Sequence, residues 1–153
     1  MTKLDVNLDD PHEVRMTRVF DAPMRLVIRA MTEPALIMRW LGNSRSPITK
    51  CEMDTRVGGR YRYEFRRPDG VTFAMVGEIR ELAADRIVMT QAMEGMPGES
   101  VVTTTYREHA GKTTMVTVVR FPSREIRDMV AATGMTDGAG ESYDNLDALV
   151  QRL

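Results

Sequence analysis

The segment Arg60–Arg66 alternates charged and aromatic side chains without a break, reading Arg-Tyr-Arg-Tyr-Glu-Phe-Arg. Successive side chains of a β-strand point to opposite faces, so the aromatic residues share one face and the charged residues share the other. The pattern predicts an antiparallel strand with one buried face and one face in water. The next residues, 67–70, read Arg-Pro-Asp-Gly and predict a hairpin turn, because proline presets φ and glycine accepts a positive φ.

Two hydrophobic periods divide the rest of the chain. The strand period predicts strands at 13–20, at 71–82, 86–93, 101–108 and 113–121, and in the segment from Ile48 onward. The helical period predicts two short helices between residues 21 and 42, with Asp21 and Thr32 as their N-caps. Ser123 is the expected N-cap of a further short helix that ends near Thr133. An apolar stripe predicts a last helix; its members are Tyr143, Leu146, Leu149, Val150 and Leu153.

This order of elements predicts an α+β fold. Strands joined in sequence by tight turns form an antiparallel meander, and the apolar face of such a sheet needs a cover. The amphipathic C-terminal helix is the expected cover. The 153 residues suit one domain, which we place at residues 13–153 behind a flexible N-terminal arm at residues 1–12.

Charge and composition exclude several classes of function. The net charge of −1 gives no field that would attract nucleic acid or an anionic membrane surface. The polar start of the chain and the lack of a long apolar run predict a cytoplasmic protein with no membrane segment. Cys51 is the single cysteine and is expected to be an inert, half-buried thiol.

No catalytic set is evident in the sequence. The two histidines, His12 and His109, fall in the arm and beside a hairpin turn, where surface positions are expected. Neither belongs to a metal-binding motif, and no serine nucleophile motif occurs. We therefore predict no metal and no cofactor.

Short segments spread along the chain resemble the activator-of-Hsp90-ATPase-homologue-1-like family, within the START/Bet v 1-like group that is also called SRPBCC. The segments that carry the resemblance are Val19-Phe20-Asp21-Ala22-Pro23, Ala30-Met31-Thr32-Glu33-Pro34, Arg39-Trp40-Leu41-Gly42, Cys51-Glu52-Met53-Asp54, Arg56-Val57-Gly58-Gly59-Arg60-Tyr61-Arg62-Tyr63, Pro68-Asp69-Gly70, Pro122-Ser123-Arg124-Glu125, Gly134-Met135 and Glu141-Ser142-Tyr143-Asp144-Asn145-Leu146. Their order over residues 13 to the end is more specific than any one of them. The resemblance implies a helix-grip fold, in which a curved antiparallel sheet grips a long C-terminal helix around a cavity. It implies far less about function.

A cavity of this kind would be lined by side chains from the inner face of the sheet and from the helices. The 13 methionines also suit an adaptable apolar wall. The candidate ligand-binding residues are Trp40, Tyr61, Tyr63, Phe65, Phe73, Met75, Met89, Met115, Tyr143 and Leu146. The alternative for each of them is an ordinary place in a packed core.

The function favoured by these residues is non-catalytic binding of a small hydrophobic or aromatic molecule. Two alternatives stay open at this point: an enzyme of the polyketide cyclase or aromatase kind, and an interaction module that stimulates the ATPase of an Hsp90-type chaperone. A homodimer is also compatible with the sequence. Three glycines, Gly134, Gly138 and Gly140, weaken the helix ahead of Tyr143, and we expect this region to be the mobile gate of the cavity.

Overall fold

The computed structural model describes residues 3–153, and within this range the strands form one eight-stranded sheet. The strands are β1 (Asp5–Asn7), β2 (Glu13–Phe20), β3 (Ile48–Met53), β4 (Arg60–Arg66), β5 (Thr72–Ala83), β6 (Arg86–Met93), β7 (Ser100–His109) and β8 (Lys112–Arg120). Their order in the sheet is β1-β2-β8-β7-β6-β5-β4-β3, and each neighbouring pair is antiparallel. Hairpins join β3 through β8, whereas β2 reaches the far side of the meander and pairs with β8.

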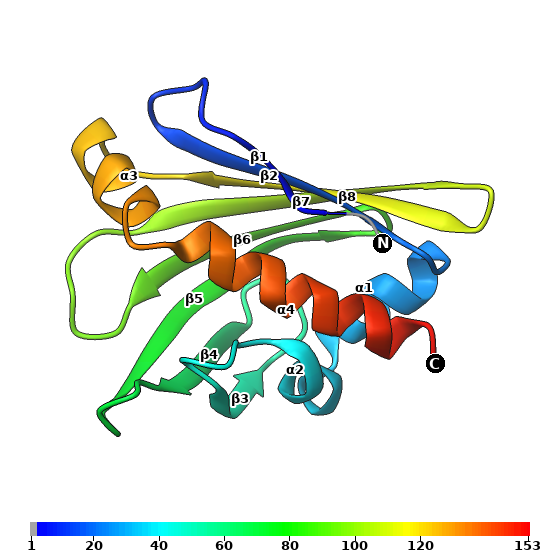
Figure 1. Cartoon of the computed structure of the whole chain (residues 1–153), viewed down its shortest axis with the longest axis horizontal. Helices are drawn as coiled ribbons and strands as arrows, with labels where there is room; N and C mark the ends of the chain where they lie inside the picture. The colour runs from blue at the N-terminus through cyan, green and yellow to red at the C-terminus, as the bar shows by residue number, and fades with distance from the viewer. Residues whose placement is uncertain (1–2) are drawn as a thin grey trace.

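Four helices accompany this sheet in the described chain: α1 (Met24–Thr32), α2 (Pro34–Trp40), α3 (Arg124–Ala131) and α4 (Met135–Val150). Figure 1 shows α4 running across the face around which the strands curve, with α1 and α2 beside its C-terminal part and α3 near the end of β8. The predicted α+β helix-grip fold is confirmed, because a curved antiparallel sheet is covered by the C-terminal helix.

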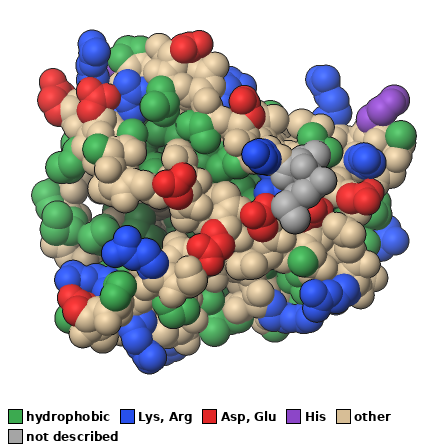
Figure 2. Space-filling model, in the orientation of Figure 1, with side chains coloured by type: hydrophobic (Ala, Val, Ile, Leu, Met, Phe, Trp, Pro, Cys, Tyr) green, Lys and Arg blue, Asp and Glu red, His purple; other side chains and the backbone are tan. Residues whose placement is uncertain are grey.

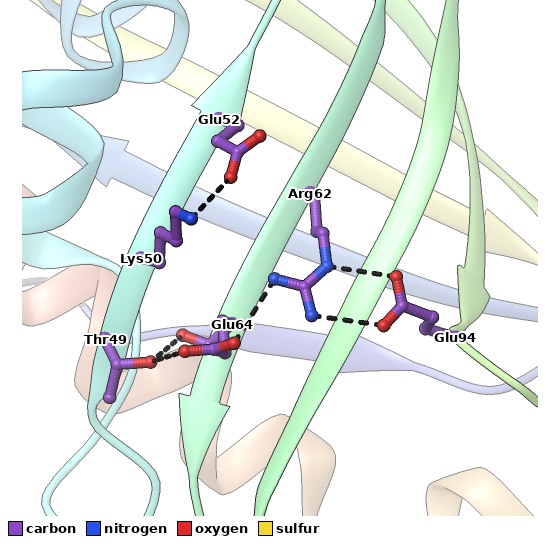
Figure 3. A network of polar contacts seen from close by, with 6 residues as sticks. All are labelled: Thr49, Lys50, Glu52, Arg62, Glu64 and Glu94. Atoms are coloured by element: carbon purple, nitrogen blue, oxygen red, sulfur yellow. Dashed lines mark hydrogen bonds and ion pairs between the residues drawn. The ribbon is translucent and has the colours of Figure 1, made fainter.

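The alternation in β4 has the predicted consequence. Tyr61 and Phe65 are buried on the inner face, while Arg60 and Arg66 are exposed. On the outer face, Arg62 binds Glu94 through two nitrogens, at 3.0 and 3.1 Å, and also contacts Glu64 at 3.3 Å. Figure 3 shows this network together with Thr49, which donates to Glu64 at 2.7 Å. These contacts raise the pKa of Arg62 and lower the pKa of both carboxyl groups.

The first two helices begin one or two residues away from the expected caps. The N-cap of α1 is Pro23 and that of α2 is Glu33, and neither makes a side-chain cap hydrogen bond. The predictions for Asp21 and Thr32 were therefore wrong. The hydroxyl of Thr32 donates back to the carbonyl of Ile28 at 2.8 Å, so it closes the last turn of α1 and is not free to cap α2.

The C-terminal helix is longer at its start and shorter at its end than the sequence indicated. It begins at Met135, immediately after Gly134 with φ of 82°, so Gly138 and Gly140 lie inside the helix and not before it. Leu153 lies beyond the helix and is exposed. The separate helix after Ser123 is confirmed, and the Ser123 hydroxyl accepts from the Ile126 amide at 3.2 Å.

The segment expected as an arm has ordered contacts from residue 5 onward. Strand β1 pairs with β2. The buried Arg127 side chain donates to the carbonyl groups of Leu8, Asp10 and Glu13, at 3.0, 2.9 and 3.1 Å. The sheet therefore extends past the boundary that we placed at residue 13. Residues 1 and 2 lie outside the described chain.

The most unusual core residue is Arg18, whose side chain is only 1% exposed. It lies on the inner face of β2 and contacts Asp144 of α4 at 2.6 Å and Asp147 at 3.6 Å. Its guanidinium carbon also lies 5.6 Å from the centre of the Phe20 ring. The residue that interrupts the apolar pattern of the first long strand therefore anchors the C-terminal helix to the sheet.

Two further observations concern possible sites. None of the helices that the structure describes is long and apolar enough to cross a membrane. Over residues 3–153, no three His, Cys, Asp or Glu side chains are grouped as a metal site would need.

Candidate functional site

A cavity of about 150 Å³ lies between the sheet and the first half of α4. Strands β5, β6, β7 and β8 contribute its floor, α2 and the end of α1 contribute one wall, and α4 forms the roof. The apolar part of the wall includes Trp40, Leu41, Ile79, Ile87, Met89 and Val102. The polar atoms come mainly from hydroxyl side chains, so the site is an apolar space with a few polar groups, as is typical of small-molecule pockets.

The hydroxyl groups on the floor come from the β7–β8 hairpin. Thr104 lies directly opposite Thr117 in the register of the two strands, and Tyr106 lies opposite Met115. Residues opposite one another share a face of the sheet, so Thr104, Tyr106 and Thr117 lie at neighbouring positions on the inner face. All three line the cavity.

Two of these hydroxyl groups are buried without a hydrogen-bond partner, those of Tyr106 and Thr117. Tyr106 is 5% exposed and Thr117 is 4% exposed. Most buried polar groups in proteins are hydrogen-bonded, so a pair of orphan hydroxyls in one cavity needs an explanation.

The aromatic side of the cavity is held rigidly. The Trp40 indole N–H donates to the Ala30 carbonyl at 2.8 Å, which fixes the ring against α1. Tyr143 lies 6.2 Å from Trp40 between ring centres and meets Phe20 edge-on at 6.3 Å. Close aromatic contacts of this kind stabilise one arrangement of the rings.

The electrostatics of the cavity favour neutral groups. Burial raises the pKa of the phenols of Tyr63, Tyr106 and Tyr143, because it disfavours their charged forms. The Thr117 hydroxyl lies near the Tyr143 phenol and partly offsets this rise, although the two groups do not adopt hydrogen-bonding geometry. Cys51 lies on β3, opposite Tyr63 of β4. Burial raises the pKa of its thiol to about 11, so the thiol is protonated at neutral pH, which supports the expectation of an inert cysteine.

An open groove adjoins the cavity at the start of α4. Leu41, Ala139 and Ser142 line both spaces, so the groove leads into the cavity. Figure 2 shows hydrophobic side chains around a hollow at the left of the view, beside the beginning of α4. The helix approaches the loop after α2 closely here, because the Ser142 hydroxyl donates to the Gly42 carbonyl at 2.7 Å.

The structure divides the ten candidate residues among three places. Those that line the cavity are Trp40, Tyr63, Met89 and Tyr143. Phe65 and Phe73 stack at 5.4 Å and line the groove. The other four, Tyr61, Met75, Met115 and Leu146, line neither space.

These four side chains stay out of both spaces for different reasons. Tyr61 crosses over Gly77 and donates its hydroxyl to the Thr90 carbonyl, so its ring and hydroxyl are both occupied. Met115 and Leu146 are fully buried members of the hydrophobic core between helix and sheet. Met75 lies opposite Tyr63 in the β4–β5 pair without reaching the cavity.

Sequence reasoning missed the polar residues of the cavity wall. Thr104, Tyr106, Gln91, Thr117 and Ser142 were not among the candidates, yet all line the cavity. A signal for Tyr106 was present, because the Ala110-Gly111 turn sets a register that places it opposite Met115. No such signal exists for Ser142, whose position depends on how α4 meets the loop after α2.

Comparisons with known proteins agree with this fold. A crystal structure of a protein from Rhodobacter sphaeroides has a TM-score of 0.91 and 26% identity, over 99% of this chain and 99% of that chain. A crystal structure of a protein from Mycobacterium smegmatis has a TM-score of 0.86 and 26% identity, over 97% of this chain and 96% of that one. A solution NMR structure of a protein from Arthrobacter aurescens, at 23% identity and a TM-score of 0.85 over 98% and 91% of the two chains, shares the fold.

No curated protein matches the chain significantly in sequence. The family model described as "Activator of Hsp90 ATPase homolog 1-like protein" matches residues 21–151. This match covers most of the chain, and it agrees with the observed architecture. The chain therefore belongs to the activator of Hsp90 ATPase homolog 1-like family, within the SRPBCC superfamily.

Proposed function

We propose that this protein binds one small, largely apolar molecule in the space between the sheet and α4. The observation that carries the proposal is the cavity itself, about 150 Å³ in volume and walled by apolar side chains. Protein interiors are usually packed without voids of this size, so the space has a cost in stability that a ligand would offset.

The volume sets the size of the molecule. A dry apolar cavity of about 150 Å³ is known to take up benzene, so one aromatic ring is the expected scale. If ligand and protein each bury on the order of 150 Å² of apolar surface, the gain is about 7.5 kcal/mol at 25 cal/mol per Å², before the cost of association. Affinity for a simple ring is therefore expected in the millimolar range, because 1 mM corresponds to about 4 kcal/mol of net binding free energy. A larger molecule would also have to occupy the adjoining groove.

The test fills the cavity from the helix. Ala139 lines both the cavity and the groove, so Ala139→Phe places a ring in the proposed site. We expect p-xylene to bind the unaltered protein and to lose at least tenfold in affinity for Ala139→Phe, as measured by isothermal titration calorimetry. The free energy of unfolding should change by less than about 1 kcal/mol, because an existing space tolerates added volume better than a packed core does.

Ala148→Phe is the matched control, because Ala148 lies exposed on the same helix. This variant should bind p-xylene as the unaltered protein does. If the unaltered protein binds no one-ring probe and Ala139→Phe unfolds, the space is only a packing defect. The interaction-module function on a chaperone partner would then be the one to pursue.

A further inference from the structure

We infer that the ligand of this cavity is an uncharged molecule that places one oxygen atom, of a carbonyl or hydroxyl group, against the hydroxyls of Tyr106 and Thr117. The inference rests on the proposed function and specifies the chemistry of the ligand. It follows from two observations: which buried hydroxyls lack partners, and which charges are missing from the cavity wall.

Four other buried hydroxyl groups have partners on the backbone. Tyr61 donates to the Thr90 carbonyl, Thr113 donates to the Ala22 carbonyl at 2.7 Å, and Ser142 donates to the Gly42 carbonyl at 2.7 Å. The Thr90 hydroxyl accepts from the Glu78 amide at 3.0 Å.

The hydroxyls of Tyr106 and Thr117 have no such partner, and both residues line the same cavity. Their strands place them at diagonal positions on one face, a separation that an aromatic side chain can span. A hydroxyl rotation that paired Thr117 with Tyr143 would still leave Tyr106 without a partner. A buried polar group with no partner destabilises a protein, so a ligand oxygen between these hydroxyls would satisfy both at once.

The lack of charged side chains around the cavity further limits which ligands can bind. Among the described residues, those that line the cavity include no Asp, Glu, Lys, Arg or His. The cavity also disfavours the charged forms of its own tyrosines, since burial raises their pKa. A carboxylate or ammonium ligand would be buried without a counter-charge, which is strongly unfavourable. The expected ligand is therefore a neutral one-ring phenol, alcohol, ketone or amide, and not a fatty acid.

The first experiment compares p-cresol with p-xylene, which differ by a hydroxyl in place of a methyl group. Isothermal titration calorimetry gives the ratio of the two affinities for each protein. We expect this ratio, p-cresol over p-xylene, to fall about tenfold in Tyr106→Phe and severalfold in Thr117→Val. Because the removed hydroxyls have no partner in the empty protein, neither substitution should lower the melting temperature.

Thr113→Val is the matched control. Thr113 lies on the same strand and the same face as Thr117, but its hydroxyl is bound to Ala22 and it does not line the cavity. This variant should lower the melting temperature and leave the affinity ratio unchanged. The opposite behaviour of the two threonines would separate ligand recognition from general stability.

The second experiment compares benzamide with benzoate, which have similar shape and differ in charge. Benzamide should bind at least tenfold more tightly at neutral pH. Equal binding of the two probes, or an affinity ratio that Tyr106→Phe and Thr117→Val leave unchanged, would overturn the inference while p-xylene binding still upheld the proposed function. If no probe binds the unaltered protein, both fail together.

Discussion

The two halves of α4 pack against the same sheet in opposite ways. The half from 143 to 150 carries large side chains, and Leu146, Leu149 and Val150 are fully or almost fully buried. The half from 135 to 142 carries small residues on the side that faces the rest of the protein. Gly138 lies against Asn43 in the loop after α2, and Ala139 and Ser142 line the groove and the cavity. One continuous helix therefore closes the core at one end and leaves a space at the other.

The polar contacts differ in the same way. The second half is fixed to the sheet by the buried Arg18, which pairs with the half-exposed Asp144 and lies near Asp147. The first half is fixed to a loop, through Ser142 to the Gly42 carbonyl and through Glu141, which accepts from the Ser44 amide at 2.8 Å. A helix held firmly at one end can remain over a cavity that gives its other end few apolar contacts.

The largest expected effect comes from removing the charges that compensate Arg18. Asp144→Asn with Asp147→Asn keeps the shape and the acceptor oxygens but leaves the guanidinium buried with no carboxylate. We expect a loss of about 3 to 5 kcal/mol in the free energy of unfolding, measured by urea denaturation. The control is Glu141→Gln, on the exposed side of the first half, which should cost less than about 1 kcal/mol. Similar losses from the two changes would show that the pairing of Arg18 with these carboxylates does not fix the second half.

Truncation should also distinguish the halves. Leu146 is 0% exposed, so Leu146→Ala should cost about 3 kcal/mol through lost burial and a new cavity. Met89 lines the existing cavity and has fewer neighbours to lose, so Met89→Ala should cost about 1 kcal/mol. Denaturation of both variants under one set of conditions gives the comparison. A larger loss for Met89→Ala would mean that the cavity closes in solution.

The sequence predicted the parts of this fold that depend on local rules. The alternation in β4 requires one buried face whatever the sheet order, and the Pro-Asp-Gly turn fixes the next strand. The Ser123 cap and the Tyr143, Leu146 and Leu149 stripe follow from backbone hydrogen bonding and helical spacing. The pairing of β2 with β8 was not predicted, because no local pattern indicates which distant strands are neighbours.

The failures depend on contacts between distant segments. The contact between Arg18 and Asp144 follows from no local pattern, because the two residues are 126 positions apart in the sequence. The prediction that Thr32 caps α2 was wrong because one hydroxyl can either cap the next helix or bond to the carbonyl of the preceding turn. Which of the two it does depends on how α1 ends. The sequence also could not show that Met89 and Tyr143 line the cavity whereas Met115 and Leu146 do not. The pattern of apolar residues does not determine the distance between helix and sheet.

Hydrogen exchange should show a smaller difference between the halves. Two glycines inside the first half each weaken a helix by about 1 kcal/mol relative to alanine, and the adjoining spaces remove packing. Amides between 138 and 142 should exchange at least tenfold faster than those between 144 and 149. This result is what the proposed gate requires, and equal protection of the two segments would remove the gate from the account of ligand entry.

The smallest expected effect comes from replacing the two glycines of the helix with alanine, one at a time. A Cβ at Gly140 would meet nothing within 4 Å, so Gly140→Ala should stabilise the protein by up to about 1 kcal/mol through helix propensity alone. A Cβ at Gly138 would lie 2.8 Å from the Asn43 side-chain nitrogen. Asn43 has little freedom to move, because its side-chain oxygen accepts from the Arg45 and Ser46 amides at 3.0 and 2.9 Å.

Gly138→Ala should therefore lose the propensity gain to crowding and fall about 1 kcal/mol below Gly140→Ala in paired urea denaturation. Gly140→Ala should also slow exchange in the first half while leaving p-xylene affinity unchanged, since residue 140 lines neither the cavity nor the groove. Equal stabilisation by both alanines would mean that the first half of α4 stands further from the loop after α2 than Asn43 and Gly138 indicate. The glycine at 138 would then reflect flexibility and not a close approach of helix to loop.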